Sequence, residues 1–213
     1  MDASINIRGL KRFAVEHAGD VPVPAPLPPT GKKVAVIGGG PGGISAAYYL
    51  ALMGHAVTIF ESKKKLGGML RYGIPSYRLP REILDKEIAE LMSVGITVKT
   101  ETTVGEDPSI IDLKKDFDAV YIAIGAQTDK KIGIEGEDAK GVVSAVEMLR
   151  GIGDDEMPDF KGKDIIVIGG GPCTYNPEPI ADFFDLFYIG EGEPQYYPLI
   201  ALYKEHKNSG GSR

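Results

Sequence analysis

The chain has 213 residues, with 24 Lys and Arg against 30 Asp and Glu, so its net charge is −6. This charge argues against a nucleic-acid partner, and no apolar run is long enough to form a membrane helix. The single cysteine, Cys173, excludes an intrachain disulfide, and three scattered histidines show no metal-ligand spacing. Because the start is polar and has no signal-peptide pattern, we expect a cytoplasmic protein.

The chain begins with a predicted amphipathic helix and a proline-rich segment. Residues 5–18 place Ile7, Leu10 and Phe13 on one helical face. Residues 21–30 read VPVPAPLPPT, a composition that favours a stiff, extended linker. We therefore expect a short docked helix followed by a surface connection.

The segment from Lys33 to Glu61 has the pattern of a strand, a glycine turn, a helix and a second strand. Val34–Ile37 is predicted as the first strand and Ala56–Phe60 as the second. The helix between them is predicted from Ile44 to Met53. An acidic residue after the second strand completes the pattern of a dinucleotide-binding unit.

Each part of this pattern has a physical role in binding a dinucleotide. Gly38 permits a tight turn, Gly40 lets the backbone approach a pyrophosphate, and Gly43 lets the helix pack close to the strand. The helix N-terminus offers free N–H groups to phosphates. Glu61 can accept hydrogen bonds from an adenosine ribose and would repel a 2′-phosphate, which favours FAD or NAD over NADP at this turn.

The segment after Glu61 favours a flavin dinucleotide over NAD. Gly67 and Gly68 follow the acid closely and let the backbone pass near a bound dinucleotide, a turn that plain NAD domains usually lack. Arg71 and Arg78 are candidates for a phosphate or for the polar edge of a flavin, although a surface salt bridge is the better interpretation of Arg71.

The rest of the chain alternates between helical and strand patterns, which predicts an α/β fold with a parallel sheet covered by helices on both faces. The strand predicted at 117–126 is almost wholly apolar and ends at Gly125, where ligands of such sheets bind. Residues 104–117 are predicted as a loop. The other expected elements are a helix at 80–94, a strand at 96–100, a helix at 144–152 and a strand at 163–168.

Five segments together resemble one family over about four-fifths of the chain: INIRGLKRF, the glycine turn, ESKKKLGGM, GIPSYRLP and FDAVYIAIGA. They are similar to the small-subunit family of glutamate synthase, which includes the FAD/NADPH half of dihydropyrimidine dehydrogenase. The resemblance implies FAD on the first dinucleotide fold and NADPH on a second, inserted fold. It also implies that electrons leave through iron–sulfur clusters, here carried by a partner subunit because the cluster cysteines are absent.

The candidate cofactor-binding set joins residues implied by the resemblance to the two glycine turns. No side chain is a credible general acid, general base or metal ligand, so a flavin would carry the chemistry. The set is Gly38, Gly39, Gly40, Pro41, Gly42, Gly43, Glu61, Ser62, Gly67, Gly68, Met69, Arg78, Val104 and Gly125.

The end of the chain departs from the family. A second glycine turn at Gly169 runs into prolines at 172, 177 and 179, which prevent a helix from starting directly after it and argue against an NADPH site there. From about residue 169 the tail resembles the N-terminal part of a radical SAM protein family, without that family's CxxxCxxC motif. A genuine fusion, an engineered join and an assembly error all explain a join at this shared glycine string.

These observations predict four segments. They are a helix left from an N-terminal iron–sulfur domain at 1–20, a linker at 21–32, an FAD-binding domain at 33–150, and an aberrant α/β tail at 151–213 that replaces the second nucleotide-binding domain. The expected function is an FAD-dependent oxidoreductase fragment with an open flavin side. The alternatives are a nonenzymatic nucleotide-binding fragment, an NAD-binding Rossmann protein and a radical SAM accessory protein.

Overall fold

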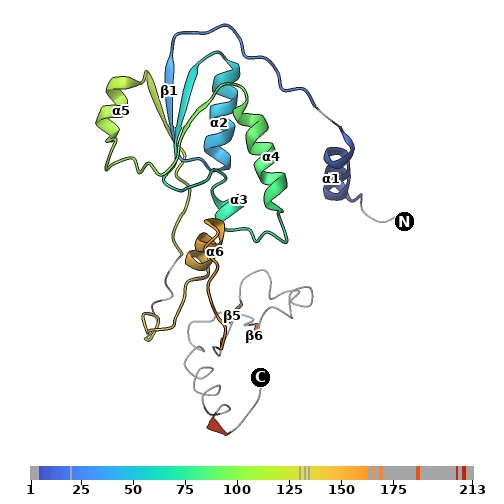
Figure 1. The fold of residues 1–213 in the computed structure, drawn as a ribbon, viewed down its shortest axis with the longest axis vertical. Coiled ribbons are helices and arrows are strands. Elements are labelled where there is room, and N and C mark those ends of the chain that lie inside the picture. Colours follow the sequence, from blue (N-terminus) through green and yellow to red (C-terminus); the bar gives the residue numbers. More distant parts are fainter. Residues whose placement is uncertain are drawn as a thin grey trace. The chain divides into compact units, whose positions relative to one another are not determined.

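The computed structural model describes residues 5–19, 21–129, 131, 133, 135–162, 165, 168–169, 186–187, 205 and 208–209 (Figure 1). Two compact units are present. The first comprises Met1–Thr128 and Ala145–Glu156, and the second comprises Asp129–Ser144 and Met157–Arg213. The four segments expected from the sequence stay a prediction.

The first unit is built on a parallel sheet of four strands in the order β3-β2-β1-β4. Its strands are β1 (Lys33–Ile37), β2 (Ala56–Phe60), β3 (Thr97–Lys99) and β4 (Ala119–Ile122). Val36 of β1 lies opposite Ile59 of β2 on one side and Tyr121 of β4 on the other. The predicted parallel α/β fold is confirmed, although β3 and β4 are shorter than the patterns at 96–100 and 117–126.

Helices cover both faces of this sheet, as expected (Figure 1). On one face, α2 (Pro41–Leu52) and α4 (Arg81–Met92) pack over side chains that include Val34, Val36 and Ile59. On the other face, α5 (Ile110–Asp116) inserts Leu113 against a smaller cluster of buried residues, Ala35, Ile37 and Phe60. Alternate residues of β1 therefore point into different cores, which is why the strand is apolar from Val34 to Ile37.

Helix α5 corrects the expectation of a loop at 104–117. Ser109 caps the helix, because its side chain accepts a hydrogen bond from the Asp112 N–H, and Lys115 pairs with Asp112 within the helix. Local capping thus gives helical structure to a segment with few apolar residues. The short helix α3 (Met69–Tyr72) also forms where the sequence predicted only a glycine turn.

Strand β4 is less covered than its apolar sequence predicts. Tyr121 is 47% exposed and Ile122 is 59% exposed. Among the described residues β4 is an edge strand that pairs with β1 alone. No neighbouring strand in the described part of the chain covers its other side, and its side chains are more exposed to solvent. Beyond the strand, Ile124 is exposed as well.

The N-terminal segment contacts the sheet domain through its proline-rich part. Helix α1 (Ile7–His17) is capped by Asn6, and none of its residues is buried. The Leu27 N–H donates to the Leu52 carbonyl, and the Thr30 N–H donates to the Gly54 carbonyl. The predicted linker therefore ends as an ordered strap across the C-terminal turn of α2.

The remaining helix of the first unit is α6 (Ala145–Gly153), close to its predicted position at 144–152. In the second unit, β5 (Ile168–Gly169) pairs in parallel with β6 (Leu186–Phe187). Cys173 and the prolines at 172, 177 and 179 lie outside the described residues. No helix in the described part of the chain combines the length and apolar character that a membrane crossing requires.

Asp118 joins the starts of β1 and β4, and its contacts make the stability of the domain depend on pH. The hydrogen bond from the Lys32 ammonium lowers the pKa of this carboxyl below its ordinary value, and the hydrogen bond from the Lys33 N–H lowers it further. Its contribution to stability is therefore present above the pKa of the unfolded chain and is lost as the pH falls through the lower folded pKa.

We expect Asp118→Asn to lower the thermal unfolding midpoint at neutral pH and to have no effect in acid, where the carboxyl is protonated in both states. Midpoints measured at both pH values test this. Asp116→Asn, which removes a nearby carboxylate without touching this contact, is the control. An equal loss at both pH values would contradict the prediction.

Candidate functional site

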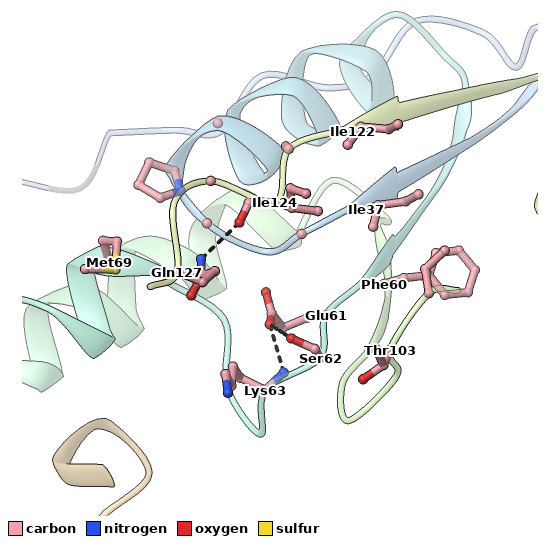
Figure 2. A pocket seen from close by; sticks show the side chains of 18 of the residues that line it. Ile37, Phe60, Glu61, Ser62, Lys63, Met69, Thr103, Ile122, Ile124 and Gln127 are labelled. Atoms are coloured by element: carbon pink, nitrogen blue, oxygen red, sulfur yellow. Dashed lines mark hydrogen bonds between the residues drawn. The ribbon is translucent and has the colours of Figure 1, made fainter. Parts of the chain in front are cut away.

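A cavity of about 430 Å³ opens at the carboxyl ends of β1, β2 and β4 (Figure 2). This is the edge at which open parallel sheets bind ligands. Its walls come from the glycine turn after β1, the loop after β2, the residues after β3 and the turn after β4. The lining includes Ile37, Gly38, Gly40, Pro41, Gly42, Phe60, Glu61, Ser62, Lys63, Gly68, Met69, Tyr72, Thr102, Thr103, Val104, Tyr121, Ile122, Ala123, Ile124, Gly125 and Gln127.

The first glycine turn allows a close approach of backbone on two sides. Gly38 has φ +105°, and a Cβ there would meet the Ala123 carbonyl oxygen at 2.4 Å. A Cβ on Gly43 would lie 1.8 Å from the Gly38 carbonyl oxygen. Helix α2 begins at Pro41, three residues before its predicted start, because proline suits a first helical position. Its N-terminus therefore faces the cavity.

Glu61 lies at the end of β2 and is only 7% exposed. One carboxylate oxygen accepts the Gly39 N–H at 2.7 Å, and the other accepts the Lys63 N–H at 2.8 Å and the Ser62 hydroxyl at 3.3 Å. Since a carboxylate has about four lone-pair positions, about one is left for a ligand. The carboxylate thus joins two walls of the cavity as well as facing it.

The second glycine pair packs against the first turn. The Gly67 N–H donates to the Gly39 carbonyl at 2.8 Å. A Cβ on Gly68 would come within 2.6 Å of the Gly40 Cα. Both residues have positive φ, at +123° and +50°. The pair therefore brings two backbone turns together at the mouth of α2, an approach that side chains would block.

The structure brings most of the candidate cofactor-binding residues together. Gly39, Gly43 and Gly67 support the cavity from behind through the contacts just described. Arg78 is exposed and does not line the cavity, so its contact with a cofactor stays a prediction. Ten candidates line it: Gly38, Gly40, Pro41, Gly42, Glu61, Ser62, Gly68, Met69, Val104 and Gly125.

Arg71 is not the surface residue that the sequence suggested. Its side chain is buried and forms an ion pair with Asp85 of α4, while its Nε–H donates to the Leu66 carbonyl at 2.7 Å. The guanidinium therefore holds the loop after β2 against α4. The expectation of a salt bridge was right, and the expectation of a surface position was wrong, because contacts with the Leu66 carbonyl and with Asp85 of α4 hold the side chain inside.

Sequence reasoning missed several lining residues. Thr102 and Thr103 follow β3, and Gln127 follows the glycine turn after β4. Their positions just beyond strand ends could have identified them, because the carboxyl ends of parallel strands meet at one edge of the sheet. Tyr72 gave no such signal, because its place in the wall depends on α3. In the described part of the chain, no group of three or more His, Cys, Asp or Glu could hold a metal ion.

Comparison with known protein families gives a match to the pyridine nucleotide-disulphide oxidoreductase model over residues 32–175. The chain belongs to this family. The match includes the glycine turn, Glu61 and every residue of the cavity lining. It confirms the resemblance to nucleotide-dependent flavin oxidoreductases that the sequence motifs indicated.

Curated relatives place the chain near two kinds of oxidoreductase subunit. It is 42% identical over 197 residues to the beta subunit of NADP(+)-dependent formate dehydrogenase of Moorella thermoacetica, which covers 80% of this chain and 28% of the relative. It is 38% identical to the small chain of glutamate synthase [NADPH] of Bacillus subtilis, and this match covers 80% of this chain and 37% of the relative. The chain thus spans about a third of the length of these relatives.

Solved structures agree with the family. FprA of Mycobacterium tuberculosis in complex with NADPH matches with a TM-score of 0.56 and 26% identity, covering 66% of this chain and 34% of FprA. A 2-naphthoyl-CoA reductase complex matches with a TM-score of 0.53 and 28% identity, covering 75% and 23%. Both similarities support the Rossmann-like fold.

The tail has a separate similarity. Residues 156–213 match the model for the N-terminal part of radical SAM proteins, which confirms the predicted resemblance and starts it earlier than residue 169. This match overlaps the oxidoreductase match from 156 to 175. The overlap contains the glycine string at which the sequence predicted a join.

Proposed function

We propose that the cavity binds FAD and that this chain is the FAD-binding part of an NAD(P)H-dependent oxidoreductase. The observation that carries the proposal is the cavity itself, in which the N-terminus of α2, the anchored Glu61 and the Gly67–Gly68 turn converge at the ends of the strands. The family match supports a redox cofactor of this type.

The residues present fit a dinucleotide with a flavin. The free N–H groups at the start of α2 suit the pyrophosphate, and glycines at 38 and 40 let the phosphates approach the backbone. Glu61 suits a ribose hydroxyl. Apolar side chains at Ile122 and Ile124 suit the remaining, aromatic part of the ligand. When bound, FAD supplies the hydride and electron chemistry, and this chain's residues bind and orient it.

The names of the relatives support a proposal for the electron donor and the electron acceptor. Several are named for NADPH or NADP(+), which supports NADPH as the donor. Several are also named as beta subunits or small chains, which supports a partner subunit that receives the electrons. We propose that this partner carries iron–sulfur clusters. The cytoplasmic location expected from the sequence stays a prediction.

The first test is the visible absorption spectrum of the purified 213-residue chain with and without added FAD. We expect a flavin band that stays with the protein through gel filtration and is shifted relative to free FAD, because the cavity excludes part of the solvent. A preference for NAD over FAD in a parallel titration, or added FAD that behaves as free FAD, would contradict the proposal.

A nonenzymatic FAD-binding fragment is the second candidate, and the exposure of Tyr121, Ile122 and Ile124 on the open side of the cavity favours it. Efficient hydride transfer requires a donor held close to the flavin. Addition of NADPH to the FAD-loaded chain under anaerobic conditions distinguishes the two. Rapid bleaching of the flavin band favours the oxidoreductase, and slow bleaching at the rate of free FAD favours the fragment.

A further inference from the structure

An acidic run at the end of α6 contacts a basic run beside the cavity. Asp155 pairs with Lys65, with 2.5 Å between the carboxylate oxygen and Nζ, and Glu156 pairs with Lys64 at 2.9 Å. Each pair joins residues 90 or more positions apart in the chain. The preceding acid, Asp154, accepts a hydrogen bond from the Tyr72 hydroxyl at 3.0 Å. Asp155 and Glu156 therefore hold the loop that follows Glu61 directly, and Asp154 acts on it through Tyr72.

Tyr72 is the buried centre of this contact. Its side chain is 3% exposed, lines the cavity, and accepts the Lys65 N–H at 3.2 Å. Burial, together with the nearby Asp154 carboxylate, raises the pKa of the phenol, so the hydroxyl stays protonated and can donate. A Cβ on Gly153 would meet the tyrosine ring at 2.3 Å, which shows how closely α6 fits against α3.

The same segment reaches a second wall of the cavity. The Arg150 guanidinium donates to the Gln127 carbonyl, and the Gln127 side-chain amide donates to the Ile124 carbonyl at 3.0 Å. Gln127 and Ile124 both line the cavity. Residues 150–156 therefore bind the walls formed after β2 and after β4. We call this segment the clasp.

We propose that the clasp positions the cavity for its dinucleotide, with Tyr72 and Asp154 as positioning residues that set the loop from Ser62 to Gly68. This inference rests on the proposed binding of FAD. The loop carries the Glu61 contact at one end and the Gly67–Gly68 turn at the other. Release of the clasp would leave both ends free to move, and a pre-organised site would lose affinity.

Electrostatics alone predicts the opposite change in FAD affinity when the clasp acids are removed, and this difference makes the inference testable. The clasp acids neutralise Lys64 and Lys65, and their removal would leave two free cations near a site for a negative pyrophosphate. If the acids acted only through charge, their loss would tighten FAD binding. If they position the loop, their loss weakens it.

The experiment measures the dissociation constant of FAD by flavin fluorescence for Tyr72→Phe, Asp154→Asn and the double variant, each in the 213-residue chain. We expect each single variant to bind about fivefold more weakly, the effect of one lost hydrogen bond, and the double variant to be no weaker than either. Tyr49→Phe on α2 and Glu90→Gln on α4 are matched controls, and we expect wild-type affinity for both.

A charge exchange separates positioning from general damage to the fold. Asp155→Lys should weaken FAD binding, and Lys65→Asp in the same chain should restore most of it, because the pair is rebuilt with reversed charges. Unchanged or tighter binding in Tyr72→Phe and Asp154→Asn would overturn the clasp alone. A wild-type chain that binds no FAD would instead overturn the proposed function on which the clasp rests.

Discussion

Gly43→Ala is expected to destabilise the domain by about 1–3 kcal/mol and to abolish FAD binding at micromolar concentrations. The added Cβ would lie 1.8 Å from the Gly38 carbonyl oxygen, a backbone atom that cannot rotate away. Helix α2 would have to move from β1, and that movement would displace its N-terminus from the cavity. Urea unfolding followed by circular dichroism gives the free energy, and an FAD titration gives the affinity.

The adjacent glycine provides the control. A Cβ on Gly42 would meet no atom within 4 Å, so Gly42→Ala should leave stability unchanged or slightly raised, since alanine favours a helix more than glycine. The two variants differ by one position and carry the same side chain. Equal stability of both would contradict the packing role of Gly43 and the described contact of α2 with β1.

Glu61→Ala should weaken FAD binding about 10-fold to 100-fold, the range for a lost hydrogen bond to a charged group. The substitution should also destabilise the domain by about 1–3 kcal/mol, because the buried Gly39 N–H loses its only described side-chain acceptor. The ligand contact and the join between the two turns are therefore lost together. The same titration and unfolding measurements test both parts.

Glu61→Gln separates these contributions. Its amide oxygen can still accept the Gly39 N–H, but its amino group would face the Lys63 N–H, donor against donor. We expect stability and affinity between those of the wild type and Glu61→Ala. Ser62→Ala, which removes the longest of the three contacts at 3.3 Å, should change little. A Glu61→Gln chain that binds as weakly as Glu61→Ala would mean that charge alone matters.

The sequence predicted the central unit of the fold well because its features are local. The glycine spacing, the apolar strands on either side and the acid after Phe60 follow one another within a single strand–helix–strand unit. Helices α4 and α6 were also predicted near their observed bounds, since each has a clear apolar stripe. In these places, the nearest neighbours along the chain largely determine the structure.

The errors came from contacts between distant segments. The burial of Arg71 depends on Asp85 and α4, and the exposure of Tyr121 depends on which strand lies beside β4. Neither partner can be read from the residues around it. The error at helix α5 has a local cause. Ser109 followed by Asp112 is a capping signal, but the polar composition of the segment led to the prediction of a loop.

The position of β1 between β2 and β4 has a consequence for synthesis of the chain. β1 can pair with β2 soon after both leave the ribosome, but its other edge cannot pair until β4 has been made. Lys33 of β1 and Asp118 before β4 are separated by 85 residues. At about 5–20 residues per second, a ribosome needs roughly 4–17 s to make that stretch. During this interval an apolar strand edge is unpaired, so nascent chains that stall before β4 should be the ones that aggregate or recruit chaperones.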